Sequence, residues 1–301
     1  MTTKGNIGFV GLGGMGAGLV KNLLANGVTV AVLDKRPQAM ETAIGRGARA
    51  AQSPAELAEH CDVLMVCVNT AEDSESVVVG MLDHLATGKI VVEHTTTNPD
   101  SITRLDAAVR ATGAEFAEAP MTRTPMHADR GEVNVLYGGP ADLLDKLHPL
   151  FDCYAENVFH VGPLTHAIKL KLIHNYIAFA NVASWCEGFA LAAKEGLDMS
   201  QVIGIISAAG GKSGMMDLYG RSTLARDFEP MMSLANAKKD VGYYVEWLKQ
   251  AGFPAFMADA VHQTYALAAI MGHADESCTA VIKAYETLSG VEARLPDEKS
   301  K

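Results

Sequence analysis

The chain has 301 residues, of which 49% are hydrophobic, so it is long enough to form two domains with cores of their own. Its 35 acidic and 25 basic residues give a formal net charge of -10 with no offsetting basic run, which argues against binding to nucleic acid or to an anionic membrane surface. Residues 1–5 lack an apolar secretory segment and no apolar stretch reaches the ~18 residues of a spanning helix, so we expect a soluble, cytoplasmic protein.

Between residue 6 and about residue 161, short β-branched runs alternate with helical patterns, which is typical of a parallel sheet with crossover helices. Two helices carry clear start signals, at Ser53-Pro54 and at Asn98-Pro99, where a capping side chain precedes a proline. We therefore expect a doubly wound α/β domain over residues 1–162. The predicted strands are Ile7–Val10, Val28–Leu33, Val63–Val68, Ile90–Val92, Glu115–Glu118, Val133–Tyr137 and Val158–Val161.

The first predicted strand ends in Gly11-Leu12-Gly13-Gly14-Met15-Gly16, a GxGxxG run that leads directly into a helical pattern. The first glycine of such a run makes a tight turn, the second lets backbone N–H groups approach a pyrophosphate, and the third lets helix and strand pack closely. Asp34 ends the next strand, where a carboxylate can accept both ribose hydroxyls of NAD and repel the extra phosphate of NADP. Lys35 and Arg36 beside it could partly reverse that choice. The pattern predicts a Rossmann-type dinucleotide site that favours NAD and leaves NADP possible.

Beyond Gly162-Pro163 the β pattern ends and long segments of helical period follow. We expect an all-helical second domain, residues 163–301, with helices over residues 166–195, 199–208, 233–251, 256–271 and 276–289. Gly210-Gly211-Lys212-Ser213 is not a phosphate-binding loop, because no strand precedes it and the glycine spacing of that motif is missing. We interpret it as a helix-breaking loop, in which Gly211 and Lys212 either contribute to a substrate pocket or serve as a plain connector.

Cysteine and histidine spacings give no sign of a disulfide framework or a metal centre. The five cysteines form no CxxC pair and lie mostly in apolar segments, so buried reduced thiols are expected. The ten histidines show no HxxxH or HExxH spacing, and no metal site is predicted.

Three further motifs carry a family resemblance. The glycine run continues as Lys21-Asn22-Leu23, Thr95-Thr96 precedes Asn98-Pro99, and Lys171-Leu172-Ile173-His174-Asn175 opens the helical half. Together they resemble the β-hydroxyacid dehydrogenase family, which includes 3-hydroxyisobutyrate dehydrogenases and tartronate semialdehyde reductases, and the likeness extends over nearly the whole chain. The resemblance implies an NAD-dependent oxidoreductase that interconverts a small β-hydroxyacid and its semialdehyde.

The resemblance also assigns roles to single residues. Lys171 is similar to the family's catalytic lysine, and Asn175 to the asparagine that helps to hold the substrate. Positions i and i+4 lie on one face of a helix, so one substrate can meet both the amine and the amide. Thr96 is implied to lie near the nicotinamide of the cofactor, and Asn69 to lie in a loop that lines the cofactor. Lys239, in Lys239-Asp240, is implied to approach cofactor and substrate, with a structural ion pair as the alternative.

The expected substrate loop departs from the family. Many relatives read Asp-Ala-Pro-Val-Ser-Gly-Gly, whereas this chain reads Glu118-Ala119-Pro120-Met121-Thr122-Arg123-Thr124. Arg123 replaces a glycine, and a guanidinium fork suits bidentate recognition of a carboxylate, a sulfonate or a phosphate. We therefore predict that Thr122, Arg123 and Thr124 form the substrate-binding loop and that Arg123 grips the anion. An Arg-Thr pair here resembles the 3-sulfolactaldehyde reductase branch, but Thr122 and Pro125 differ from it, so a carboxylate, a sulfonate and a surface ion pair all stay open.

Other hypotheses remain beside this one. Related helical-domain enzymes reduce imines, although they replace the catalytic lysine that this chain retains as Lys171. A catalytically idle module that binds NAD and acts through partner contacts is the alternative from another class. His166 and His174 either contact substrate or pack behind the site. The family's helical domain commonly mediates dimers and tetramers, so a homodimer or homotetramer is expected, with a small anionic semialdehyde or hydroxyacid as the other partner.

Overall fold

The computed structural model describes residues 6–296. Residues 1–5, on which the expected lack of a secretory segment rests, lie outside the described part. The chain divides into two compact units, Met1–Lys171 and Leu172–Lys301. The domain boundary predicted between residues 162 and 163 stays a prediction.

The first unit is built on one sheet whose strands follow the order β3-β2-β1-β4-β5-β6-β8-β7, with β9 paired to β8. All seven predicted strands are present, and two additional strands of two residues each, β3 and β7, were not predicted. The strands are β1 (Ile7–Val10), β2 (Val30–Leu33), β3 (Arg49–Ala50), β4 (Val63–Val66), β5 (Ile90–Glu93), β6 (Glu115–Glu118), β7 (Met121–Thr122), β8 (Val133–Gly138) and β9 (Ala155–Gly162).

The sheet is parallel from β3 to β6, but β8 runs antiparallel to both β6 and β7. Parallel neighbours need a long crossover connection, usually a helix. Between β6 and β8 the chain forms only β7 and the six-residue helix α6 (Pro125–Arg130), which do not carry it back across the sheet. The doubly wound α/β class is confirmed, and the reversal at β8 is a departure from an all-parallel sheet.

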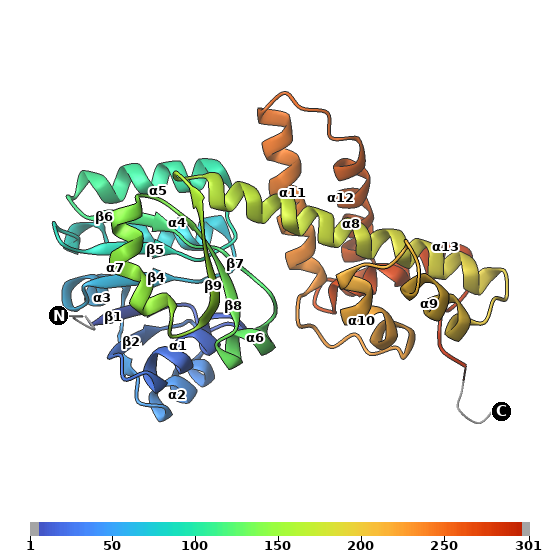
Figure 1. Ribbon diagram of the computed structural model, residues 1–301, viewed down its shortest axis with the longest axis horizontal. Helices are drawn as coiled ribbons and strands as arrows, with labels where there is room; N and C mark the ends of the chain where they lie inside the picture. The colour runs from blue at the N-terminus through green and yellow to red at the C-terminus, as the bar shows by residue number, and fades with distance from the viewer. Residues whose placement is uncertain (1–5, 297–301) are drawn as a thin grey trace. The chain divides into compact units, whose positions relative to one another are not determined.

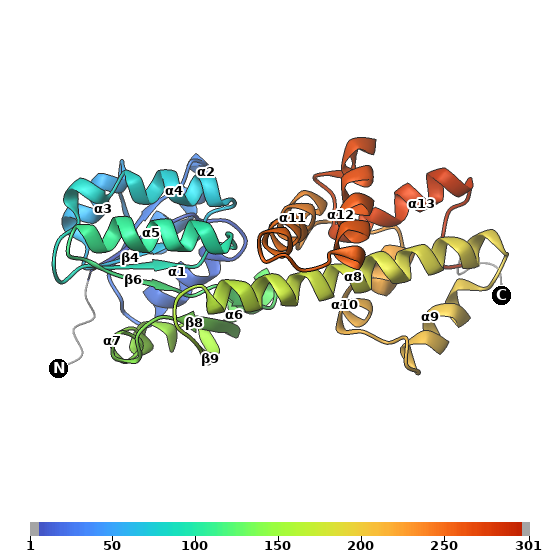
Figure 2. The ribbon, with the colours of Figure 1, turned by 90° about the horizontal axis from the view of Figure 1, so that it is seen from above.

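Helices cover both faces of this sheet. Figure 2 shows α3, α4 and α5 on one face, with α1 and α7 on the other. The two predicted helix starts are present: the side chains of Ser53 and Asn98 accept the N–H groups of Glu56 and Ser101. The helices are α1 (Gly16–Ala25), α2 (Pro37–Gly45), α3 (Pro54–His60), α4 (Ala71–Val79), α5 (Pro99–Ala111) and α7 (Ala141–Phe151).

The second unit is helical, as expected (Figure 1). Helix α10 was not predicted, because Gly214 and Gly220 interrupt its apolar pattern. The helix expected over residues 256–271 ends regularly at Ala268 and continues as a π-helical turn in which Gly272 has a φ of 98°. The helices are α8 (His166–Lys194), which begins in the first unit, α9 (Met199–Ser207), α10 (Gly214–Leu224), α11 (Leu234–Gln250), α12 (Phe256–Ala268) and α13 (Ile282–Ser289).

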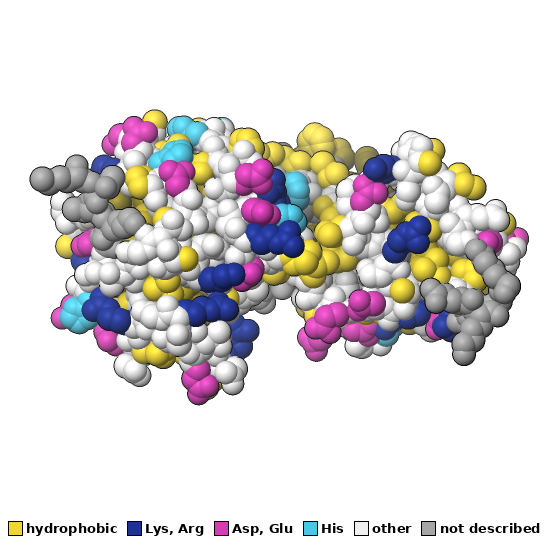
Figure 3. Space-filling model, turned by 60° about the horizontal axis from the view of Figure 1, so that its bottom comes forward, with side chains coloured by type: hydrophobic (Ala, Val, Ile, Leu, Met, Phe, Trp, Pro, Cys, Tyr) yellow, Lys and Arg dark blue, Asp and Glu magenta, His cyan; other side chains and the backbone are white. Residues whose placement is uncertain are grey.

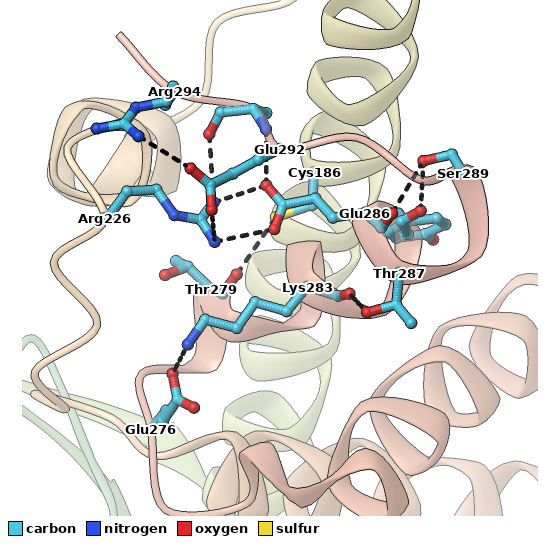
Figure 4. Close-up of polar contacts among 12 residues, drawn as sticks. Cys186, Arg226, Glu276, Thr279, Lys283, Glu286, Thr287, Ser289, Glu292 and Arg294 are labelled. Atoms are coloured by element: carbon cyan, nitrogen blue, oxygen red, sulfur yellow. Dashed lines mark hydrogen bonds and ion pairs between the residues drawn. The ribbon is translucent and has the colours of Figure 1, made fainter. Parts of the chain in front are cut away.

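An ion pair joins Arg226, which follows α10, to Glu286 on α13 (Figure 4). The guanidinium of Arg226 donates to both carboxylate oxygens of Glu286, over 2.6 and 3.0 Å. Glu286 also accepts the N–H of Ala293 over 2.8 Å, and the N–H of Leu295 bonds the carbonyl of Leu224 over 3.0 Å. The segment that follows α13 is therefore tied back onto the end of α10.

Surface features agree with the composition. On the face drawn in Figure 3, basic side chains lie interspersed with acidic ones. Within residues 6–296, no helix is long and apolar enough to cross a membrane. In the same part of the chain, no cluster of three or more His, Cys, Asp or Glu side chains is arranged to hold a metal ion.

Candidate active site

The glycine run forms the turn between β1 and α1. Gly11 has a φ of 96°, and a Cβ there would lie 2.1 Å from the carbonyl oxygen of Cys67. A Cβ at Gly16 would lie 2.0 Å from the carbonyl oxygen of Gly11, so both glycines are needed for the fold itself. At Gly13 a Cβ would have no neighbour within 4 Å, which leaves its backbone open to an approaching ligand. Met15 caps α1 without a side-chain hydrogen bond, and the turn therefore fits a pyrophosphate at the helix N-terminus.

Asp34 lies directly after β2, as predicted, and its carboxylate is already engaged. It accepts the N–H of Leu12 over 2.6 Å and the N–H and Nε–H of Arg36 over 2.8 and 3.0 Å. Burial opposes ionisation, but the hydrogen bonds from Arg36 and Leu12 outweigh it and lower the pKa of Asp34. A cleft of about 310 Å³ between α1 and α2 adjoins this pair, and its lining includes the basic residues Lys21, Arg36 and Arg46.

Two loops that follow β4 and β5 lie together. The N–H of Val68 donates to Oγ1 of Thr95 over 3.1 Å, which brings the neighbouring residues Asn69 and Thr96 to the same edge of the sheet as the glycine turn. Thr95 is held in turn by Glu93, a fully buried carboxylate that accepts the N–H of Thr95 over 2.7 Å. Burial raises the pKa of Glu93 to about 7, against hydrogen bonds from Ser74 and Thr95. Sequence reasoning did not identify Glu93.

The predicted substrate loop lies next to the glycine turn. Helix α6, which follows the loop, packs on α1: the Asn22 amide donates to the carbonyl of Ala128 over 2.8 Å, and a Cβ at Gly14 would lie 3.1 Å from Pro125. Thr122 accepts a hydrogen bond from the amide of Asn134 over 3.2 Å. The structure thus brings the loop and the dinucleotide turn together within one unit.

Arg123 and Thr124 are each held locally in this structure. Thr124 Oγ1 lies 2.8 Å from Nδ1 of His127. Arg123 has a φ of 80°, in the left-handed region that favours glycine. Its guanidinium pairs with the carboxylate of Glu156 and donates to the carbonyl of Glu132 over 2.6 Å. The predicted role of Arg123 as an anion anchor stays a prediction.

Lys171 lies on the second turn of α8, and a buried carboxylate holds the first turn. Glu118, at the end of β6, accepts the N–H groups of Ala167 and Ile168 over 3.0 and 3.1 Å. Burial raises the pKa of Glu118 to about 7, against hydrogen bonds from these N–H groups. Lys171 itself is buried, with 9% of its surface exposed. The sequence analysis included Glu118 only as part of the substrate-loop motif. A carboxylate at the end of an apolar strand was the signal that could have identified it as a site residue.

In the helical unit, Asp240 joins two of the predicted residues. It accepts the amide of Asn175 over 2.6 Å and the ammonium of Lys239 over 2.7 Å, and it is 2% exposed. Nδ1 of His174 lies 2.9 Å from Oδ1 of the Asn175 side-chain amide. Lys239 also lies over the ring of Tyr243, 4.9 Å from its centroid. The ion pair offered as the alternative for Lys239 is present, and its role toward a cofactor stays a prediction.

Gly211 is the remaining residue of the predicted substrate site. It belongs to the exposed loop between α9 and α10, where a Cβ would meet the side chain of Ile206 at 2.8 Å. Lys212 pairs with Asp217 over 3.2 Å. Among residues 6–296, no hydrogen bond joins Gly211 to Asn175 or Asp240. Its assignment to a substrate pocket gains no support from these contacts.

Comparison with known proteins identifies the family. Residues 6–162 match the NAD binding domain of 6-phosphogluconate dehydrogenase, and residues 166–285 match the NAD-binding domain of NADP-dependent 3-hydroxyisobutyrate dehydrogenase. The chain belongs to the β-hydroxyacid dehydrogenase family. Among its members, L-threonate dehydrogenase of Cupriavidus necator is 30% identical over 93% of this chain and 96% of its own length.

Two further comparisons are with a solved structure and with a human protein. The crystal structure of 3-hydroxyisobutyrate dehydrogenase from Salmonella typhimurium superposes with a TM-score of 0.85 and 27% identity, covering 92% of this chain and 99% of that one. The human cytokine-like nuclear factor N-PAC is 29% identical over 94% of this chain, which spans 52% of that protein. The predicted family, the α/β class and the NAD(P) cofactor are confirmed, and the chain is an NAD(P)-dependent dehydrogenase of this family.

Proposed function

We propose that this protein interconverts a small anionic β-hydroxyacid and its semialdehyde, with Lys171 as the group that moves the proton. The observation that carries the proposal is a buried ammonium on a helix whose first turn is held by Glu118. When bound, the nicotinamide cofactor supplies or accepts the hydride. The Lys171 ammonium then hydrogen-bonds the carbonyl oxygen and donates a proton to it. The names of the Cupriavidus and Salmonella relatives refer to small hydroxyacids, which supports this substrate class.

We also propose substrate-binding roles for Asn175 and Arg123. Asn175 stands one helical turn after Lys171, and its amide is fixed by Asp240, so its orientation is set before substrate binds. Arg123 grips the anionic group of the substrate. A non-glycine residue in the left-handed region costs about 1 to 3 kcal/mol, and such strain is often retained for function. That cost supports a role for the arginine.

We propose NAD as the preferred cofactor, because the ionised Asp34 carboxylate suits ribose hydroxyls and repels a 2′-phosphate. Arg36 is the opposing element, since release from Asp34 would free its guanidinium for that phosphate. Fluorescence titration with NADH and NADPH tests this. Arg36→Ala should weaken NADPH binding about tenfold and leave NADH binding nearly unchanged. Stronger binding of NADPH than of NADH by the unaltered protein would contradict the preference.

A glycine pair tests the dinucleotide turn itself. A Cβ at Gly13 meets nothing in the protein, so Gly13→Ala should keep the fold and lose NADH affinity by about tenfold or more through its clash with the pyrophosphate. Gly45→Ala, at the end of α2, is the matched control, because its Cβ also has no neighbour within 4 Å. Equal NADH affinity in the two variants would show that the pyrophosphate does not bind at this turn.

Lysine variants test the catalytic assignment. Lys171→Ala should lower kcat by about 10² or more while NADH binding is kept. Lys194→Ala, an exposed lysine in the last turn of the same helix, is the control and should turn over normally. The substrate panel consists of L-threonate, 3-hydroxyisobutyrate, succinic semialdehyde, tartronate semialdehyde, 3-sulfolactaldehyde and a cyclic imine. An unchanged rate in Lys171→Ala would end the proposal, and dominance of the sulfonate or the imine would reassign the substrate.

A second candidate function is the idle NAD(P)-binding module. The similarity to N-PAC, which is named as a nuclear factor, is the observation that favours it. NADH binding without turnover on any member of the panel would support this alternative. Turnover that depends on Lys171 would exclude it.

We also propose that the chain forms a homo-oligomer. Large apolar side chains of the helical unit are exposed by half or more, which favours burial against another copy; they include Phe253, Phe256, Met257, Ile270, Leu191 and Ile205. Light scattering on the purified protein gives the subunit number, and a monomer at micromolar concentration would contradict the proposal. The cytoplasmic location stays a prediction.

A further inference from the structure

Glu156 reaches Arg123 because of an irregularity in the sheet. Between β8 and β9 the register pairs Val133 with Ala155 and Asn134 with Asn157. Glu156 is therefore the extra residue of a β-bulge and has no partner on β8. Bulges re-aim side chains and occur often beside functional sites. Here the bulge coincides with the residue whose carboxylate meets the guanidinium of Arg123.

The contacts of Arg123 use one side of its guanidinium. Nη1 donates both to the carbonyl oxygen of Glu132 and to the carboxylate of Glu156. In residues 6–296, neither Nε nor Nη2 of Arg123 makes a hydrogen bond, so the edge formed by these two nitrogens keeps its donors. That edge matches the two oxygens of a planar anion. The Arg123 side chain is 28% exposed, so solvent and solutes reach it.

We propose that Glu156 is a positioning residue that orients Arg123, so that the Nε and Nη2 edge is presented to the anionic group of the substrate. The proposal rests on the proposed function, in which Arg123 is the anion anchor. Without Glu156, Arg123 would keep one acceptor, the Glu132 carbonyl, and its flexible side chain would have to be ordered when substrate binds. Orientation of this kind acts on substrate binding and not on the transfer of hydride or proton, so it should appear in KM.

The residues next to Glu156 and Arg123 hold the substrate loop through separate hydrogen bonds. Asn157, next along β9, donates to the amide oxygen of Asn134 over 2.9 Å, and Asn134 donates to Thr122 over 3.2 Å. Strand β9 thus holds two consecutive residues of the substrate loop, Thr122 through Asn134 and Arg123 through Glu156. We therefore expect the loop to keep its place when Glu156 alone is changed, so that the effect of the substitution can be assigned to Arg123.

Kinetics with the preferred anionic substrate test the proposal. Glu156→Ala should raise KM about fivefold or more at unchanged kcat, and Glu156→Gln, which still accepts a hydrogen bond, should raise it about twofold. Asp145→Asn on α7, which packs on β9, removes an equal charge from an exposed position and should leave KM unchanged. In an Arg123→Ala background, Glu156→Ala should have no further effect. Substrate converted to its methyl ester should respond to neither substitution.

The outcomes distinguish a failure of this inference from a failure of the proposed function on which it rests. If Arg123→Ala leaves KM unchanged, the anion anchor of the proposed function is lost. If Arg123→Ala raises KM but Glu156→Ala does not, the anchor stands and the role of Glu156 is wrong. A fall of KM in Glu156→Ala would show that the carboxylate competes with the substrate, and that result also overturns the proposal.

Discussion

Both units bury a glutamate, and they compensate its charge in different ways. In the sheet unit, Glu118 is fully buried and accepts the backbone N–H groups of Ala167 and Ile168. In the helical unit, Glu286 is 6% exposed and faces both nitrogens of the Arg226 fork (Figure 4). Peptide donors at a helix start supply partial charge, whereas a guanidinium supplies a full one.

This difference makes the two buried glutamates sensitive to different changes. Burial raises the pKa of Glu118 to about 7, because backbone N–H groups and the charge of Lys169 do not outweigh it, and burial raises the pKa of Glu93 in the same unit in the same way. The sheet unit therefore couples its stability to pH near neutrality. The helical unit depends instead on the presence of a partner charge, because a buried carboxylate without its partner is costly.

The largest expected effect comes from breaking the ion pair. Arg226→Met keeps an apolar stem beside Phe228 but leaves Glu286 without its countercharge. We expect the free energy of unfolding to fall by about 3 kcal/mol, measured by urea denaturation. Adding Glu286→Leu should restore most of the loss. A loss below about 1 kcal/mol would mean that the pair behaves like a surface ion pair.

A smaller effect is expected at the start of α8. Glu118→Ala leaves two buried N–H groups without an acceptor and should cost about 2 kcal/mol. Amide hydrogen exchange at Ala167 and Ile168 should accelerate, and kcat should fall because Lys171 follows on the next turn. Unchanged protection of these two amides would show that Glu118 does not hold the helix.

The pH dependence of stability should identify the same carboxylate. A raised pKa means that folding takes up a proton, so the stability from Glu118 is fully present below its ordinary pKa of 4.5 and is lost as pH rises through about 7. Relative to Glu118→Gln, the unaltered protein should lose up to about 1.4 kcal/mol per pH unit in that window. His94, whose pKa burial lowers to about 4, acts in the opposite direction but is common to both proteins and cancels. A flat difference between pH 4.5 and 7 would contradict the assignment.

The smallest effect is expected where charges face water. Arg294 pairs with Glu292 over 3.4 Å, and both side chains are more than half exposed. Arg294→Ala should change the free energy of unfolding by less than about 0.5 kcal/mol. It is the control for Arg226→Met, because both remove a cation near the same C-terminal segment. A comparable loss in the two variants would erase the distinction between buried and exposed pairs.

Much of the fold could be predicted because its signals are local. The strands β1 and β6 have the predicted bounds, and the caps at Ser53 and Asn98 are present, since each depends on residues within one turn of chain. The two-residue strands β3 and β7 and the helix α10 were missed. They are short or interrupted by glycine, and pairing or packing with distant residues decides whether they form.

The site residues likewise fall into those that the local sequence predicted and those that only the fold revealed. The Gly11–Gly16 turn and Asp34 lie as the motif predicted, because glycine sterics and a strand end define them locally. The supporting acids Glu93 and Glu156 belonged to no motif, and Glu118 stood in the loop motif without a role of its own. Glu118 bonds residues about fifty positions away, so nothing near it in the sequence shows what it accepts.

The sequence by itself determined the family, the NAD(P) cofactor and the order of an α/β half before a helical half, because glycine spacing and hydrophobic period are properties of short segments. Only the tertiary structure decided which charges are compensated and how. The bulge in β9 lets Glu156 meet Arg123, and the fold brings Glu118 to backbone N–H groups about fifty positions away in the chain. A buried carboxylate takes its properties from the donors that surround it, and those donors are assembled by the fold.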